Sequence, residues 1–92
     1  MIETMQVPVE ARQKYLERRK QDVVASKEAL SKQDYSFLER LGHQVKGNAI
    51  TFGFDELTNI AVAIEQAAKA KNITQLQTLI EQFESAVNNA HL

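Results

Sequence analysis

The sequence contains no cysteine, no tryptophan, a single proline and only three glycines among its 92 residues. Without cysteine, the chain can form no disulfide bond and offers no thiolate for catalysis. The scarcity of glycine and proline leaves long uninterrupted stretches, which favours helices. The formal net charge of -1 gives no support for general binding to nucleic acid.

Long apolar runs are also missing. No stretch approaches the ~18 apolar residues of a membrane span, and residues 1–10 lack the apolar core of a signal peptide. We therefore expect a cytoplasmic protein without membrane contact. The length suits one domain. We expect residues 1–7, which show no periodicity, to form a flexible arm, and residues 8–92 to form a monomeric folded domain.

Apolar residues recur at steps of three, four and seven in four stretches, which predicts four amphipathic helices. The helices are expected from Pro8 to about Leu30, from Tyr35 to Phe52, from Phe54 or Asp55 to about Asn72, and from about Thr74 onward. The expected inward positions are Val9, Tyr15, Leu16, Val23, Val24 and Leu30; Leu38, Leu41, Val45, Ala49 and Phe52; Leu57, Ile60, Ala61, Ile64 and Ala68; and Leu76, Ile80, Phe83, Val87 and Ala90. Because the links are short, the sequence predicts an all-α, antiparallel up-down-up-down four-helix bundle.

Polar residues and one glycine mark the expected helix ends. Asp34 can cap the second helix through its carboxylate, and the pair Ser36 and Glu39 is a rival capping box. Gly53 is expected to end the second helix in a left-handed conformation. The segment 74–77 is expected to form a capping box for the fourth helix.

The polar side of the first helix is rich in basic residues, namely Arg12, Lys14, Arg18, Arg19 and Lys20. Because Glu17 and Asp22 interleave with them, the cluster is interpreted as a solvated face of mixed charge. The alternative interpretation is a basic rim that attracts an acidic partner.

The middle of the second helix carries an unusual outward face. At about 100° per residue, His43 lies almost opposite Val45, and Lys46, Gly47 and Ile50 fall on the same outer side as the histidine. A glycine inside a helix costs about 1 kcal/mol relative to alanine. Nothing in the expected core explains Gly47, so we infer that a side chain there would block something approaching His43.

The pattern His43-x-x-Lys46-Gly47, followed by Gly53 and Leu57, resembles the histidine-containing phosphotransfer (HPt) domain family. The apolar rhythm and the helical layout agree with this family over most of the chain, and Asn48 departs from it because the family often has serine there. The resemblance implies a helical bundle that carries a phosphoryl group on Nε2 of the histidine. It also implies that the partners are receiver domains of response regulators or hybrid histidine kinases.

The chemistry of these residues agrees with the resemblance. A neutral imidazole is a good nucleophile near pH 7, and Lys46 can place an ammonium group beside phosphoryl oxygens. Gly47 would give clearance, and Gln44, Ile50 and Phe54 would contact the partner. His91 is expected to be inert surface, and with His43 it completes no metal-binding spacing.

Two other classes of function compete with the phosphoryl carrier. A helical adaptor that binds a receiver or another protein without being phosphorylated would need neither His43 nor Lys46. An enzyme with its own active site is disfavoured, since no second titratable group lies near His43 in sequence. The chain also shows no glycine-rich nucleotide loop and no carboxylate cluster for Mg²⁺, so no cofactor is expected and catalysis would come from the partner.

Overall fold

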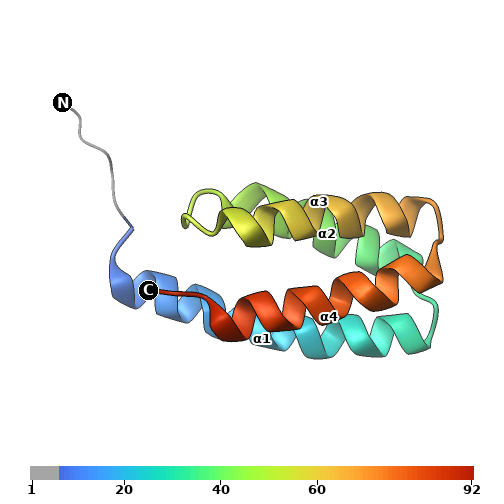
Figure 1. Ribbon diagram of the computed structural model, residues 1–92, viewed down its shortest axis with the longest axis horizontal. Coiled ribbons are helices and arrows are strands. Elements are labelled where there is room, and N and C mark those ends of the chain that lie inside the picture. Colours follow the sequence, from blue (N-terminus) through green and yellow to red (C-terminus); the bar gives the residue numbers. More distant parts are fainter. Residues whose placement is uncertain (1–6) are drawn as a thin grey trace.

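The computed structural model describes residues 7–92 and consists of four helices (Figure 1). They are α1 (Val9–Ser31), α2 (Tyr35–Ala49), α3 (Asp55–Lys69) and α4 (Ile73–Asn89), and the described residues contain no strand. The predicted all-α four-helix class is confirmed. Of the flexible arm expected over residues 1–7, all but Val7 lies outside the described residues.

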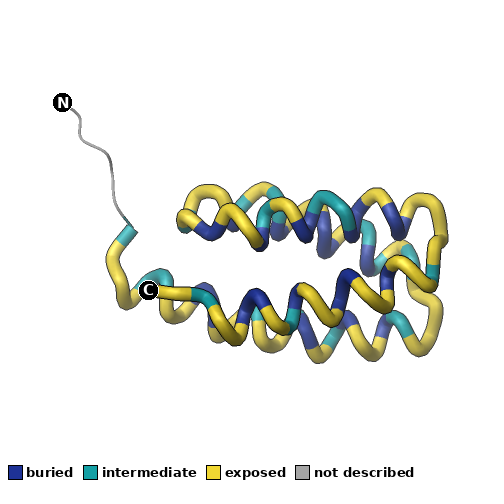
Figure 2. Tube along the Cα trace, in the orientation of Figure 1, coloured by how far each residue is buried: buried dark blue, intermediate teal, exposed yellow. Residues whose placement is uncertain are grey.

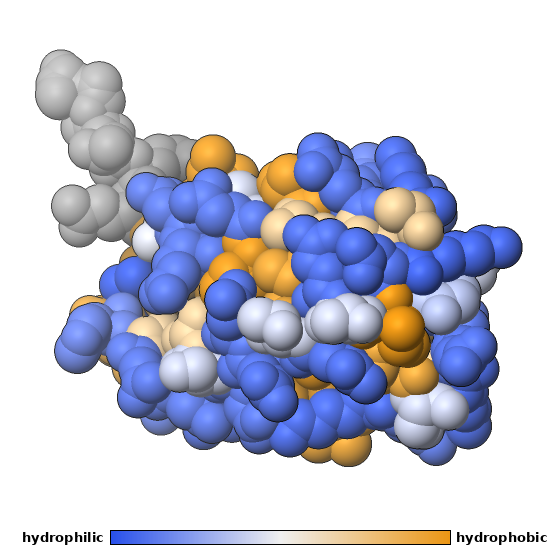
Figure 3. All heavy atoms as spheres, turned by 45° about the vertical axis from the view of Figure 1, so that its right-hand side comes forward, coloured by the Kyte–Doolittle hydropathy of each residue, from blue (hydrophilic) through white to orange (hydrophobic). Residues whose placement is uncertain are grey.

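The helices pack as a four-membered bundle. In Figure 1, each helix runs in the direction opposite to that of the helix before it. α2 packs against α1 and α3, and α4 packs against α3 and α1, with α2 and α3 forming the closest pair. Figure 2 shows buried positions on the helix faces that are turned toward one another. On the face shown in Figure 3, hydrophilic side chains cover most of the surface and leave small hydrophobic areas between them.

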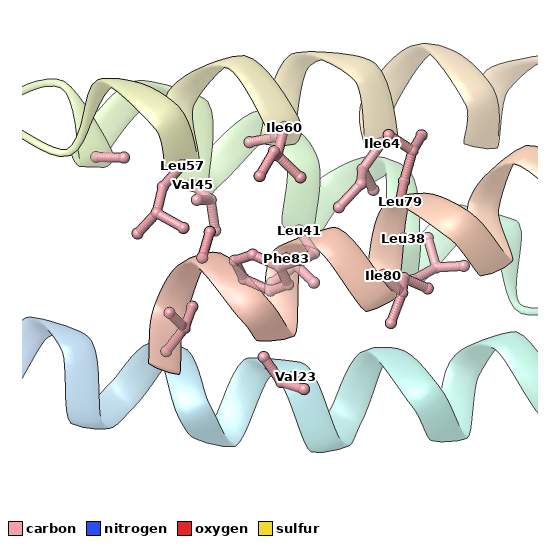
Figure 4. Packing of buried hydrophobic residues seen from close by; sticks show 14 of the residues in the cluster. Val23, Leu38, Leu41, Val45, Leu57, Ile60, Ile64, Leu79, Ile80 and Phe83 are labelled. Atoms are coloured by element: carbon pink, nitrogen blue, oxygen red, sulfur yellow. The ribbon is translucent and has the colours of Figure 1, made fainter. Parts of the chain in front are cut away.

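The core lies along the bundle axis and takes residues from all four helices. In Figure 4, Phe83 of α4 lies between Val23 of α1 and the side chains of α2 and α3. Nearly all of the inward positions expected on α2, α3 and α4 are buried, and Phe52 and Ala90 are partly buried against the core. A row of apolar side chains from each helix therefore closes one continuous core.

The prediction is wrong for two positions on α1. Val24 is 68% exposed and Val9 is 57% exposed. The buried face of α1 instead runs through Tyr15, Leu16, Val23, Ser26 and Ala29, with a step of seven and then two steps of three after the adjacent pair Tyr15 and Leu16. A residue directly after a buried one is turned by about 100°, which takes Val24 out to solvent.

All three connections between helices use the same backbone design. Gln33, Gly53 and Lys71 each adopt a positive φ, at 54°, 82° and 53° respectively. At the first connection, Gln33 N donates to Leu30 O and Asp34 N donates to Ala29 O; the same pair of bonds recurs around Gly53 and around Lys71. This is the Schellman motif, and it confirms the left-handed conformation that the sequence predicts for Gly53.

The residue after each left-handed position is the N-cap of the next helix. Asp34 accepts a hydrogen bond from Phe37 N at 3.1 Å, so the carboxylate cap is used rather than the box of Ser36 and Glu39. The N-cap of α4 is Asn72, which accepts from Gln75 N at 3.1 Å. The capping box expected at 74–77 is therefore wrong, because the third helix ends at Lys69 and frees Asn72 for this role.

The C-terminal end of α2 also differs slightly from the prediction. The sequence predicts a helix to Phe52, and α2 ends at Ala49. Phe52 N still donates to Asn48 O at 3.3 Å, so the last turn continues in helical form into the Schellman motif.

Replacing Lys71 by glycine should stabilise the fold by about 1 kcal/mol, because Lys71 holds a left-handed backbone that costs a residue with a Cβ about that much. Urea denaturation at pH 7 measures the change in the free energy of unfolding. Gln77→Gly, at an exposed position inside α4, serves as the control and should destabilise by about 1 kcal/mol. Equal effects of the two glycines would contradict the proposed strain at Lys71.

Candidate functional site

His43 lies on the outer face of α2, as the sequence predicts. Its side chain is 69% exposed, and Val45, nearly opposite, is buried. Gln44 and Gly47 are also exposed on this helix, and so is Ile50, its C-cap. The helix therefore presents the imidazole to solvent and directs its apolar stripe into the core.

Phe54 does not belong to this exposed face. The sequence suggested it as an apolar contact for a partner, but only 7% of it is exposed. Its ring packs 5.7 Å from that of Tyr15, and the guanidinium of Arg12 lies 4.6 Å above it. Because Phe54 follows the left-handed Gly53, the chain turns inward at this point, and the docking role expected for Phe54 is wrong.

Gly47 has no packing reason to be glycine. A Cβ built at this position would meet no atom within 4 Å, and its φ lies outside the left-handed region. The space beside it is open, one turn after His43 on the same side of α2. The structure therefore gives neither a packing reason nor a backbone reason for this glycine.

Glu65 is the site residue that sequence reasoning missed. It comes from α3, 22 residues after His43, and its side chain is 10% exposed. Its Oε2 lies 3.0 Å from Nδ1 of His43, and its Oε1 accepts a hydrogen bond from Lys46 Nζ at 2.7 Å. One carboxylate therefore joins the imidazole to the ammonium group.

A signal for Glu65 was present in the sequence. It stands among the buried residues Ala61, Ile64 and Ala68, which form the inner stripe of α3. Charged residues are rarely buried without partners, so a glutamate on an apolar stripe indicates a cation nearby. Only the packing of α2 on α3 shows that the partners are His43 and Lys46.

The contacts of Glu65 keep its carboxyl group ionised. The hydrogen bond from Lys46 is the main cause that lowers its pKa, and the hydrogen bond to His43 and the charges of Lys46 and Lys69 act in the same direction against the opposing effect of burial. Lys69 Nζ lies 4.0 Å from Oε2. The site thus holds a carboxylate at neutral pH.

An ionised carboxylate fixes the tautomer of the histidine. It can only accept hydrogen bonds, so Nδ1 of His43 must donate to Glu65. In the neutral ring, the lone pair is then on Nε2. Because most of the side chain is exposed, this arrangement offers an oriented nucleophile at the surface.

Gly42 allows α3 to come close enough for this contact. It is buried, and a Cβ at this position would lie 2.7 Å from the backbone N of Glu65 and 2.8 Å from Ala61 O. Both distances are shorter than a side-chain carbon tolerates, and backbone atoms cannot swing aside. The residue directly before His43 therefore sets the distance between the two helices.

The opposite flank of α2 is held by α1. The hydroxyl of Tyr15 donates to Oδ1 of Asn48, and Arg12 Nε donates to Phe52 O at 3.0 Å. Burial raises the pKa of the Tyr15 phenol, so it remains a neutral donor. These bonds fasten the last turn of α2 and the segment that follows it. They give Asn48 a structural role where the sequence showed only a small polar residue.

The surface around His43 is shallow. A hollow of about 310 Å³ lies beside the ring and is lined by Glu39, Arg40, His43, Gln44 and Glu65. Among residues 7–92, no group of three His, Cys, Asp or Glu side chains could hold a metal ion. No helix in the described part of the chain is long and apolar enough to cross a bilayer.

The two helical glycines should respond in opposite directions to alanine. Gly42→Ala should destabilise by about 1–3 kcal/mol, because its Cβ meets the backbone of α3. Gly47→Ala should stabilise by about 0.5–1 kcal/mol, because it enters open space and improves helix propensity. Thermal and urea unfolding measure both, and a stable Gly42→Ala variant with unchanged helix packing would contradict the close contact.

The ion pairs of Glu65 should make stability fall in acid. The folded pKa lies below the ordinary value of 4.5, so the stabilisation is complete above about pH 4.5 and is lost as the pH falls through the folded value. Glu65→Gln should be less stable than the wild type at pH 7 and should lose less stability between pH 5 and pH 2. Urea denaturation across this range measures the slope.

Glu81→Gln is the matched control for that experiment, since Glu81 is exposed and forms no ion pair within 4.0 Å among the described residues. Its pH profile should follow that of the wild type. An acid slope in Glu65→Gln as steep as that of the control would show that the carboxylate contacts do not stabilise the fold.

The comparison with protein families agrees with the resemblance that the sequence shows. A family model described as Hpt domain matches residues 10–91, a range that includes every residue of the site. Searches of curated proteins and of solved structures returned no significant match.

Proposed function

Because the chain belongs to the Hpt domain family, whose members are phosphotransfer modules of two-component signalling rather than catalysts, we propose that it carries a phosphoryl group on His43. The group is accepted from, and donated to, the aspartate of receiver domains in response regulators or hybrid histidine kinases. Such partners place the activity in the cytoplasm. The observation that carries the proposal is the contact between Nδ1 of His43 and Glu65.

The transfer step uses the nitrogen that Glu65 leaves free. The Nε2 lone pair attacks the phosphorus of an aspartyl phosphate, a bond forms between nitrogen and phosphorus, and the bond between phosphorus and the aspartate oxygen breaks. The aspartate leaves as a carboxylate. The imidazole ring gains positive charge, and its Nδ1–H remains hydrogen-bonded to the carboxylate of Glu65, which stabilises that charge.

Lys46 supplies a cation for the phosphoryl group. Its ammonium shares the Glu65 carboxylate with His43, so it is held one helical turn from the reacting nitrogen. A phosphoryl group adds up to two negative charges, which the ammonium offsets. The adaptor alternative gives no reason for a histidine and a lysine to be joined by one carboxylate of limited exposure.

The outer face of α2 provides access for the partner. Gly47 leaves open space beside His43, and Ile50, at 61% exposure, offers apolar contact area one further turn along. Gln44 is exposed next to the histidine and can hydrogen-bond to a partner. Since the ring lies at an exposed surface, the partner receiver has to enclose the reacting atoms and supply the catalytic groups.

Incubation with a phosphorylated receiver domain tests the proposal directly. The protein should acquire phosphate that is labile in acid and stable in base, as expected for phosphohistidine. His43→Gln should abolish the labelling without changing the helical circular dichroism signal, because its side chain is exposed.

His91→Gln is the control, since His91 is the other histidine and lies near the C-terminal end of the chain. It should label as the wild type does. Labelling that persists in His43→Gln, or that is lost in His91→Gln, would show that the assignment of the phosphoryl group to His43 is wrong. A wild-type protein that no receiver labels would contradict the carrier function itself.

A further inference from the structure

A second surface feature lies between α1 and α2. It is a groove of about 340 Å³ lined by Lys14, Tyr15, Arg18, Arg19, Asn48 and Phe52. Two of these form an aromatic floor, because the rings of Tyr15 and Phe52 stack at 4.4 Å. The groove therefore combines an apolar floor with a cationic rim.

The cations of the rim differ in how they are paired. Arg19 is held by Asp22 at 2.7 Å, and its guanidinium lies 4.4 Å above the ring of Tyr15. Lys14 and Arg18 are exposed, and neither has a carboxylate within 4.0 Å among the described residues. These two lie one turn apart on α1, an arrangement in which like charges repel each other.

Two exposed cations of this kind suit an anionic partner. A carboxylate placed between them would relieve their repulsion, and the partly exposed ring of Phe52 would accept an apolar side chain. The whole chain has a formal net charge of only -1, so this basic rim is a local feature of the surface and not a consequence of overall charge.

The groove continues the face that carries His43. Asn48 lines the groove and lies one turn after Gln44 on α2, and Gln44 lines the hollow beside His43. The hydrogen bond from Tyr15 to Asn48 holds the wall of the groove in place. A protein that covers the outer face of α2 from His43 to Asn48 therefore meets the wall of this groove.

We propose that this groove is a docking surface for an acidic face of the same receiver domain that exchanges the phosphoryl group with His43. The inference rests on the proposed function and adds a second contact region to it. Carboxylates of the receiver pair with Lys14 and Arg18, and an apolar side chain beside them packs on the partly exposed ring of Phe52. The contact speeds and orients docking and takes no part in the transfer chemistry.

Charge reversal on α1 tests the groove with a matched control. Arg18→Glu and Lys20→Glu change the net charge about equally on the same helix, but Lys20 lies about 200° further round and outside the groove. The probe is the receiver domain that labels His43 fastest. KM and kcat for transfer are measured at about 50 mM and about 500 mM salt, where screening lengths differ about threefold.

Arg18→Glu should raise KM about fivefold at low salt, Lys14→Glu should do the same, and Lys20→Glu should change KM less than twofold. The kcat should stay unchanged, and the difference in KM should shrink at high salt. Unfolding measurements on each variant should show an intact fold, since all three side chains are exposed.

Equal values of KM for Arg18→Glu and Lys20→Glu would overturn the groove as a docking surface while leaving the carrier function intact. A fall in kcat without a change in KM would also overturn it, because the groove would then act on the chemistry. Absence of His43 labelling in the wild type by every receiver would reject the proposed function, and this inference with it.

Discussion

The contact between α2 and α3 at Gly42 is the constraint on which the rest of the site depends. The missing side chain lets the backbone of α3 approach at Ala61 and Glu65. That approach brings the Glu65 carboxylate under the two outward side chains of α2, His43 and Lys46. A wider spacing would leave an exposed histidine with no fixed tautomer and a lysine with no fixed position. The packing of α3 on α2 thus determines which ring nitrogen of His43 can react.

A single carboxylate of limited exposure serves the three cationic or titratable groups around it. Burying Glu65 would be costly if it were alone, and the hydrogen bond from Lys46 and the imidazole offset that cost. The two helices that flank α2 have different roles. α3 supplies the polar partner of the reactive ring, and α1 fastens the far end of α2 through Arg12 and Tyr15. The histidine helix is therefore fixed on both flanks and open only toward solvent.

Features that depend on local periodicity could be predicted from the sequence. The outward direction of His43, the open space at Gly47 and the left-handed Gly53 all follow from helix geometry and backbone preference. The expected roles of Val24 and Phe54 failed because burial depends on which side of a helix the neighbours occupy. The spacing of apolar residues along the sequence places a residue on one side of its helix, but it does not show how the helices are arranged around one another.

Features that depend on contacts distant in sequence could not be predicted. Glu65 joins the site only when α3 packs on α2, and Gly42 matters only because of what lies opposite it. Asn72 rather than the segment 74–77 caps α4, because a tight turn before it fixes where α3 ends. In each case the deciding partner belongs to another element of the fold.

The turn around Gly53 has a consequence for insertions and deletions. Phe54 ends the cap of α2 and at once begins α3, so the connection holds no spare residue. One residue added there would rotate α3 by about 100° and shift it by about 1.5 Å relative to α2. Glu65, about three turns further on, would then face away from His43. The backbone atoms of Ala61 and Glu65 would also no longer lie opposite Gly42. The length of this turn, more than its composition, keeps Glu65 of α3 facing His43 of α2.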